Sequence, residues 1–399
     1  MTVAVLVLLV CLLLLAWPFF VYPMILARLP ERPLMRAMSG EARPSASLLF
    51  CAYNEAASLP DKLANLRALK LRYPTLEILA FNDGSADATA AMLDGAADIL
   101  TPVHGPGRAG KARGMKTLAA QAKGDVLIFT DANVLLAEDA VERLLSYYAD
   151  PLVGGVLGSL IYGGVEASSS AQVGSLYWRI EERLKNLESR TGNVMGADGS
   201  IFSVRRELYP DFPDSVQDDM TVSMNVVFAG RRLIKARDVV AHEMMVATRE
   251  DELRRKVRIA ARSWHTHRHL RPQLRRMRML DRFKYASRKL VRWFGAVWMV
   301  AAGIAALVLA WHWHPMGAIG LLLLGCGLLA MGYGSRSGPL AAVADIVLAY
   351  FATLRGVMLA ARGRDFTLWA PAKSRNGVED GQRGTGRGQD TGRERGPNG

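Results

Sequence analysis

The 399-residue chain has only three cysteines, and it lacks the two glycine-rich loops that commonly bind nucleotides. Cys11 and Cys326 lie inside apolar runs and Cys51 ends a predicted strand, so these residues give no disulfide framework and are best explained as small core residues. No GxGxxG motif follows the first predicted strand, which argues against a dinucleotide-dependent oxidoreductase. The loop around Lys111 has the wrong spacing for a Walker motif and no Ser or Thr after the lysine, so it is not a P-loop.

The N-terminus lacks the features of a cleaved signal peptide, namely a basic n-region, a short apolar core and a small-residue cleavage site. Roughly 20 apolar residues cross a bilayer, so residues 1–27 are predicted to form a transmembrane helix. Three more apolar stretches follow late in the chain, at residues 294–311, 316–333 and 340–361. The first two are predicted to span. The third contains Asp345 and Arg355, which are costly in mid-bilayer, so it either spans with a polar lining or lies in the interface.

Basic residues are in excess, with a net charge of +13, and their positions predict the topology. Lys and Arg mark the cytoplasmic side of a membrane protein. They follow the first apolar segment at Arg28, Arg32, Arg36 and Arg43, and they crowd the stretch before the second. We therefore expect a multi-pass protein of the inner (plasma) membrane whose middle domain is cytoplasmic.

Between Arg254 and Arg292 the basic residues recur beside Leu, Met, Phe and Trp. This pattern is typical of helices that lie on an anionic membrane face, so membrane lipids are expected partners. A nucleic-acid surface would carry similar charge, but the adjoining apolar span favours lipid, and no nucleic-acid partner is expected. The predicted organisation is a transmembrane helix at 1–27, a soluble domain at 44–245, basic interfacial helices at 250–292, two or three transmembrane or interfacial helices at 293–361, and a disordered tail at 372–399 that lacks apolar periodicity.

The soluble domain alternates short apolar runs with amphipathic patterns. The predicted strands are 47–52, 76–81, 98–101 and 125–130, and the predicted helices begin near Leu59 and cover 86–92, 111–122 and 138–148. Strands that alternate with helices of this length indicate a parallel sheet covered on both faces. The predicted fold class is therefore a Rossmann-like α/β domain.

Polar motifs follow three of these strands, at the sheet edge where open α/β folds bind ligands. They are Tyr53-Asn54-Glu55, Asn82-Asp83-Gly84-Ser85-Ala86-Asp87 and Asp131-Ala132-Asn133. Each has a purely structural alternative. Asn54 could cap a helix, Ser85 and Asp87 could cap a turn, and Asp131 with Asn133 could cap the next helix. The turn alternative leaves Asp83 unexplained.

Two further motifs carry charge. Gly110-Lys111-Ala112 opens a predicted helix, where the helix N-terminus and nearby cations attract anions. Asp218-Asp219 follows the loop Gly196-Ala197-Asp198-Gly199-Ser200 by about twenty residues. Two adjacent acids by themselves usually indicate a solvated loop, but these two follow the other motifs in order.

Taken together, the motifs resemble the membrane-embedded family 2 glycosyltransferases, the group that includes cellulose and hyaluronan synthases. The resemblance runs from about Ser47 to Asp219 and more weakly on to Arg375. It implies a nucleotide-sugar-binding domain of the GT-A type and an inverting transfer from a nucleotide-diphosphate sugar to a lipid-linked or saccharide acceptor. A catalytically silent membrane scaffold or transport subunit is the alternative, and the intact acids count against it.

The resemblance also implies roles for individual residues. Those expected beside the donor nucleotide or the acceptor are Tyr53, Asn54, Glu55, Asn82, Asp83, Lys111, Asp198 and Arg262. Asp131 and Asn133 match the DxD motif that holds Mg²⁺ or Mn²⁺, Asp219 matches the catalytic base, and Asp218 is its neighbour.

The chain departs from the family pattern at three places. Asn82 replaces an acid in its motif. Asn133 replaces the second acid of the DxD motif, which puts its direct ligation in doubt. The processive members carry Gln-x-x-Arg-Trp where this chain has Arg262 without the Gln and with Trp264 displaced by one, which puts polymer synthesis in doubt. Trp369 and Arg375 match a closing Trp-to-Arg signature.

Overall fold

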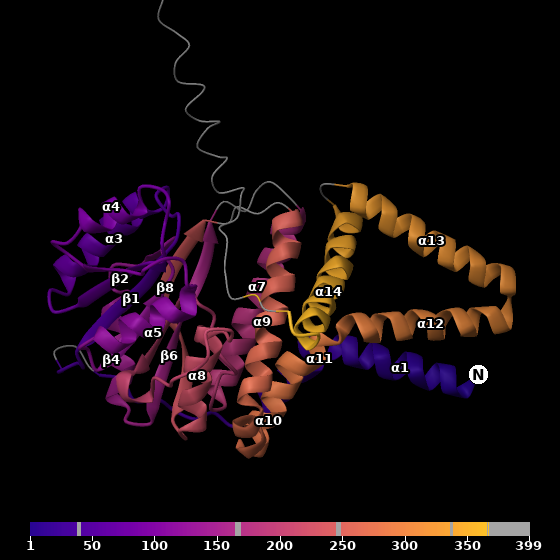
Figure 1. Cartoon of the computed structure of the whole chain (residues 1–399). Coiled ribbons are helices and arrows are strands. Elements are labelled where there is room, and N and C mark those ends of the chain that lie inside the picture. Colours follow the sequence, from indigo (N-terminus) through magenta and orange to yellow (C-terminus); the bar gives the residue numbers. More distant parts are fainter. Residues whose placement is uncertain (38–40, 164–168, 245–248, 336–337, 365, 367–399) are drawn as a thin grey trace, which may run out of the picture.

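The computed structural model describes residues 1–37, 41–163, 169–244, 249–335, 338–364 and 366. The predicted tail at 372–399, together with Trp369 and Arg375, lies outside the described residues. The soluble domain and a bundle of apolar helices lie side by side, with the basic helix α9 between them (Figure 1).

One mixed sheet forms the centre of the soluble domain. In spatial order its strands are β3 (Thr101–His104), β2 (Glu77–Asn82), β1 (Ala46–Ala52), β4 (Val126–Thr130), β7 (Ile201–Arg205), β6 (Val153–Gly163), β8 (Arg232–Met244) and β5 (Val134–Leu136). β3, β2, β1 and β4 are parallel, as the sequence predicts. The predicted third strand is placed three residues too early, because residues 96–100 continue the turn after α4 through the bond from the Leu100 amide to the Ala96 carbonyl.

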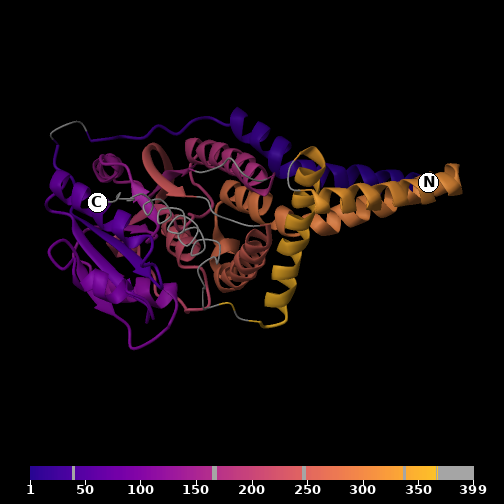
Figure 2. The ribbon, with the colours of Figure 1, turned by 90° about the horizontal axis from the view of Figure 1, so that it is seen from above.

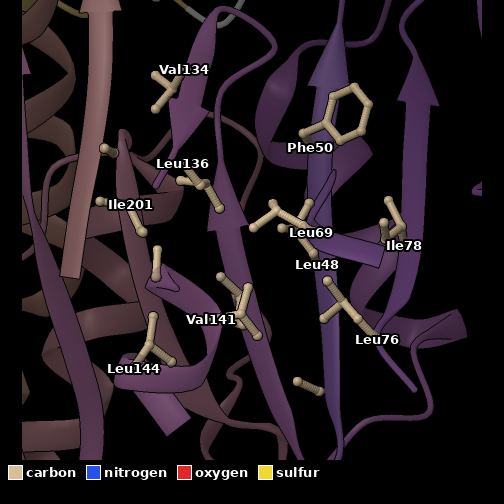
Figure 3. Packing of buried hydrophobic residues seen from close by; sticks show 14 of the residues in the cluster. Leu48, Phe50, Leu69, Leu76, Ile78, Val134, Leu136, Val141, Leu144 and Ile201 are labelled. Carbon is tan, nitrogen blue, oxygen red and sulfur yellow. The ribbon is translucent and has the colours of Figure 1, made fainter. Parts of the chain in front are cut away.

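Helices cover both faces of the sheet because successive side chains of a strand point to opposite sides. Leu48 and Phe50 of β1 pack with α3 and α6, whereas Leu49 packs with α5 and α8. Figure 3 shows the first of these clusters, in which Val141 and Leu144 of α6 lie over the strands. The helices of the domain are α3 (Leu59–Arg72), α4 (Thr89–Asp94), α5 (Lys111–Gln121), α6 (Ala140–Ser146), α7 (Ser169–Arg190) and α8 (Asp218–Phe228), with 3₁₀ turns at Tyr147–Ala149 and Arg206–Leu208.

The sheet is mixed beyond the four strands predicted to be parallel: β7 runs antiparallel between β4 and β6, and β5 runs antiparallel to β8. The first residue of β7, Ile201, pairs with the last residue of β4, Thr130. The reversed direction therefore brings the loop before β7 to the edge where the parallel strands end. β8 is parallel to β6 and ends at this edge too.

Among the described residues, four helices are long and apolar enough to cross a membrane: the N-terminal helix Thr2–Arg28, α12 (Gly295–Trp313), α13 (Pro315–Gly334) and α14 (Pro339–Ala361). The first consists of α1 (Thr2–Ala16), a π-helical turn (Trp17–Val21) and α2 (Tyr22–Arg28). Figures 1 and 2 show α1, α12 and α13 pointing away from the domain, with α14 running across their direction. Asp345 on α14 forms an ion pair of 2.6 Å with Arg249 of α9, which explains how this acid is accommodated in an apolar helix.

The basic segment forms α9 (Arg249–Arg276), α10 (Met279–Tyr285), a π-helical turn (Ala286–Leu290) and α11 (Val291–Trp293). The prediction that its cations face the membrane is wrong for Lys284 and Arg288, which are buried. Arg288 forms ion pairs with Glu181 and Glu188 of α7, and Lys284 donates to the Glu188 carbonyl. The exposed cations of this segment, for which contact with the membrane stays a prediction, are Arg254, Arg255, Arg268, Arg271, Arg275, Arg276, Arg278 and Arg282.

Candidate active site

The predicted motifs converge at the carboxyl edge of the parallel strands. Residues 53–55 follow β1, residues 82–87 follow β2 and residues 131–133 follow β4. The loop 196–200 joins them because β7 is antiparallel, and the acid pair opens α8.

The loops after β1 and β2 are tied together by hydrogen bonds. The backbone amide of Asn54 donates to Ser85 Oγ at 3.1 Å, and its side-chain oxygen Oδ1 accepts from the backbone amide of Ala86 at 2.8 Å. The Glu55 amide donates to Thr89 Oγ1 at 2.9 Å. Asn54 has a positive φ of 52°, and α3 begins only at Leu59. Asn54 therefore bridges two loops and does not cap α3, which removes the structural alternative considered from the sequence.

Asp83 holds the glycine-bearing loop in place. Its carboxylate accepts from the Ala109 amide at 2.7 Å and from the Gly110 amide at 2.9 Å. Gly84 is required next to it, because φ is +69° and a Cβ there would meet Arg108 N at 2.9 Å. These hydrogen bonds give buried Asp83 a structural role, while its expected position beside the donor nucleotide or the acceptor stays a prediction. Arg108 lies 4.0 Å from the centre of the Tyr53 ring.

Asn82, which replaces an acid of the family pattern, also has structural partners. Its Oδ1 accepts from the Ser85 amide at 3.1 Å, and its Nδ2 lies 3.2 Å from His104 Nδ1. The residue is buried and fixes the turn that carries Asp83.

Lys111 is the centre of an acidic cluster. Its Nζ lies 2.6 Å from Asp131 Oδ1 and 4.0 Å from Asp218 Oδ2. Burial opposes the charge of the lysine, but Asp131, Asp218 and Asp219 together raise its pKa above the usual value. A Cβ on Gly199 would meet Lys111 Nζ at 2.9 Å, Asp219 Oδ2 at 3.6 Å and Asp131 Oδ2 at 3.7 Å. The loop before β7 therefore lies directly against the three charged side chains.

Asp219 is suited to accept a proton near neutral pH. Burial and the adjacent Asp218 carboxylate raise its pKa to about 6, against the opposing effect of Lys111. Its Oδ1 accepts from the Met220 amide at 2.7 Å in the first turn of α8. Asp218 is almost fully buried beside it. Among acids, a raised pKa of this kind is typical of a general base.

Asp198 has the opposite environment. Its carboxylate pairs with Lys185 and accepts from the Ser200 hydroxyl. Although burial opposes its charge, Lys185 and Lys235 hold the pKa of Asp198 well below the usual range. Lys185 is itself buried, so the pair is a structural support of the loop that carries Gly199.

Helix α9 forms hydrogen bonds with the two residues that precede Asp218 and Asp219 in the sequence. Arg262 Nη2 donates to the Val216 carbonyl at 2.7 Å, and Ser263 Oγ donates to Gln217 Oε1 at 2.8 Å. The backbone amide of Gln217 donates to Thr266 Oγ1 at 2.8 Å. The expected position of Arg262 beside the donor nucleotide or the acceptor stays a prediction. Sequence reasoning missed the roles of Ser263 and Thr266, because small hydroxyl side chains in a basic helix form no recognisable motif.

A second acid, Glu243 of β8, lies beside the loop after β4, and sequence reasoning missed it. Asn133 Nδ2 donates to Glu243 Oε1 at 2.7 Å, and Glu243 stands near the end of β8. Helix α3 supports the strand that follows this loop. Buried Lys62 donates to the Val134 carbonyl at 2.6 Å, and burial lowers the pKa of this lysine to about 7.

The residues of this loop fit a divalent cation whose remaining ligands come from phosphate and water. The Asp131 side chain is 37% exposed, and the Asn133 amide adds a second hard oxygen. The described part of the chain has no group of three or more His, Cys, Asp or Glu side chains placed to hold a metal. A cation held by one or two protein oxygens is the usual arrangement where substrate phosphates complete the coordination.

Comparison with known proteins agrees with this geometry. Residues 47–212 match the family model described as glycosyl transferase family 2. An N-acetylglucosaminyltransferase of Rhizobium leguminosarum bv. trifolii is 26% identical over 123 residues, which are 30% of this chain and 68% of that protein. The poly-beta-1,6-N-acetyl-D-glucosamine synthase of Staphylococcus aureus is 25% identical over 203 residues, which are 47% of each chain, so the match spans about half of the synthase.

A solved structure shares the fold over nearly the whole chain. The mannosyltransferase PcManGT from Pyrobaculum calidifontis, in complex with GDP-Man and Mn²⁺, aligns with 89% of this chain and 98% of its own at a TM-score of 0.69 and 22% identity. The predicted GT-A type fold is confirmed by this likeness. Residues 47–212 therefore form a domain of glycosyltransferase family 2, and the protein is a glycosyltransferase.

Proposed function

We propose that the protein is a membrane-attached, inverting glycosyltransferase that moves a hexosyl or N-acetylhexosaminyl group from a nucleoside-diphosphate sugar to a lipid-linked or saccharide acceptor. The observation that carries this proposal is the cluster of Lys111, Asp131, Asp218 and Asp219 beneath the Gly199 loop at the carboxyl edge of the sheet. It combines a base, a neighbouring anion and an oxygen donor for a cation in one place.

Asp219 removes the proton of the acceptor hydroxyl. The hydroxyl oxygen then forms a bond to the anomeric carbon while the bond from that carbon to the diphosphate oxygen breaks, so that the configuration at the carbon inverts. The nucleoside diphosphate leaves with the bonding electrons, and the proton remains on Asp219. A pKa of about 6 keeps Asp219 ionised at neutral pH and makes it more basic than an ordinary aspartate.

Asp218 and α9 position this base. Buried Asp218 contributes to the raised pKa of its neighbour, and Arg262 and Ser263 fix the residues immediately before the pair. Lys111 places a positive charge between Asp131 and Asp218, and the resemblance puts this lysine beside the donor nucleotide or the acceptor.

Asp131 and Asn133 would hold a Mg²⁺ or Mn²⁺ ion. When bound, such an ion supplies positive charge to the leaving diphosphate. The oxygen donors of the loop support this assignment, and the Mn²⁺ in the complex of PcManGT, which has the same fold, agrees with it.

The apolar helices support attachment to the inner membrane with the catalytic domain in the cytoplasm. The N-terminal helix, α12 and α13 point in a common direction and would span, whereas α14 runs across them and would lie along the membrane surface. Arg28 ends the N-terminal helix, and Arg32 and Arg36 follow it on the side of the soluble domain, as cytoplasmic cations do.

Purified protein in detergent, supplied with Mg²⁺ or Mn²⁺, tests the proposal. Release of nucleoside diphosphate is measured for a panel of UDP- and GDP-sugars, beginning with UDP-N-acetylglucosamine and GDP-mannose, in the presence of saccharide and lipid-phosphate acceptors. The expected result is metal-dependent release with one donor, and an anomeric configuration opposite to that of the donor in the NMR spectrum of the product. Retention of configuration contradicts the assigned mechanism, and the absence of turnover with all donors supports the silent-scaffold alternative.

A further inference from the structure

Glu243 lies beside the proposed cation loop although it is 110 residues away in sequence. β8 and β5 pair antiparallel with Glu243 opposite Val134, the residue that follows Asn133. This register places Glu243 Oε1 at 2.7 Å from Asn133 Nδ2. Glu243 also interacts electrostatically with Arg255 of α9.

The contact fixes which way the Asn133 amide points. The side-chain nitrogen of Asn133 donates to the Glu243 carboxylate, so this nitrogen faces Glu243. The amide oxygen then faces the opposite way, and oxygen is the only atom of an asparagine side chain that binds Mg²⁺ or Mn²⁺. Asn133 therefore needs a fixed orientation to serve as a ligand, and Glu243 provides it.

We propose that Glu243 is a positioning residue of the cation site: it orients Asn133 so that Oδ1 serves as a ligand, and it supplies the negative charge that Asn133 lacks as a replacement for an acid. The proposal rests on the proposed binding of a cation at Asp131. Carboxylates that hold metal ligands in this way are common in metal sites, where their loss typically lowers affinity by about 10- to 100-fold.

The arrangement reverses a simple expectation from charge. If Asn133 is a ligand, counting charges predicts that Asn133→Asp tightens metal binding. In this structure the new carboxylate would face Glu243 where a 2.7 Å hydrogen bond now stands, and two like charges would repel. Asn133→Asp alone should therefore weaken binding of the cation. In the double variant Asn133→Asp with Glu243→Gln, the glutamine amide can donate to the new carboxylate, so the repulsion is removed. Acids then stand at both positions 131 and 133, as in an ordinary DxD motif.

The experiment measures binding of Mn²⁺ alone to the full-length protein in detergent, from the loss of the EPR signal of the free hydrated ion. Glu243→Gln and Asn133→Asp are each expected to weaken binding by about tenfold or more, and the double variant to bind within about threefold of the wild type or more tightly. Glu250→Gln is the matched control, because Glu250 is exposed on α9 and pairs only with Arg254 among the ion pairs of the described residues. Circular dichroism and melting curves of each variant establish that the fold is retained.

Two results would overturn the proposal. One is an unchanged Mn²⁺ affinity in Glu243→Gln, and the other is a double variant whose loss of Mn²⁺ binding free energy equals the sum of the losses in the two single variants. Asp131→Ala separates this failure from a failure of the cation site itself. If Asp131→Ala also leaves Mn²⁺ binding unchanged, the proposed cation site is wrong. If Asp131→Ala abolishes binding and Glu243→Gln does not weaken it, only the role of Glu243 is wrong.

Discussion

The substitution Asp219→Asn removes the proposed base and keeps the size of the side chain, and its amide oxygen can still accept from the Met220 amide. The wild-type transfer rate should fall about tenfold between pH 7 and pH 5, because the pKa of Asp219 is about 6 and only the ionised carboxylate takes a proton. A general base usually contributes about 10²- to 10⁴-fold to the rate, so Asp219→Asn should lower the rate by about that factor. The variant should also lose this pH dependence.

Two neighbouring acids serve as controls. Asp218→Asn removes a like charge that raises the pKa of Asp219, so transfer should persist and its dependence on pH should move to more acidic values. Asp198→Asn removes a partner of buried Lys185, so it should lower the melting temperature and leave the pH dependence near 6.

The assay is the steady-state rate of nucleoside diphosphate release from pH 4.5 to 8, with donor affinity measured separately by calorimetry. Donor affinity should be unchanged in Asp219→Asn, since the base acts on the acceptor. If Asp219→Asn transfers sugar at full rate while Asp198→Asn is inactive with an intact fold, the assignment of the base is refuted.

Three further substitutions test other parts of the site. Asp131→Ala should abolish turnover and weaken metal-dependent donor binding, and near-wild-type turnover at low Mn²⁺ would contradict its role. Gly199→Ala places a Cβ 2.9 Å from the flexible end of Lys111, so the melting temperature should hardly change while the rate falls about tenfold or more, and an unaltered rate would show that the position of Lys111 does not matter. Arg268→Gln with Arg275→Gln should loosen the protein from vesicles rich in anionic lipid, by about 1 kcal/mol for each cation, and sedimentation with anionic and neutral vesicles measures this difference.

Local pattern was enough to predict β1, β2 and β4, the helices α3 to α6 and the order of the motifs, but it gave no prediction for β6, β8 or α7. Residues 47–52 and 125–130 are apolar runs that end in polar groups, and they form β1 and β4 within one residue of the prediction. Such runs report burial directly, since a strand covered on both faces needs apolar side chains on both sides. The resemblance to family 2 glycosyltransferases rests on the residues that follow these strands, and the family match confirms it.

Only the tertiary structure decided how the motifs act on one another. The contacts that build the site join residues far apart in the chain. Lys111 pairs with Asp131 and Asp218, Asn133 donates to Glu243, and buried Arg288 pairs with Glu188 of α7. Such contacts depend on strand direction and register, as the antiparallel course of β7 and the pairing of β5 with β8 show. A carboxylate that pairs with a distant side chain leaves no periodicity and no local motif, so the sequence indicated the acids that follow the strands and missed Glu243. The fold decided the environment of each acid: burial and Asp218 raise the pKa of Asp219, Asp198 pairs with buried Lys185, and Asp131 is partly exposed beside Lys111.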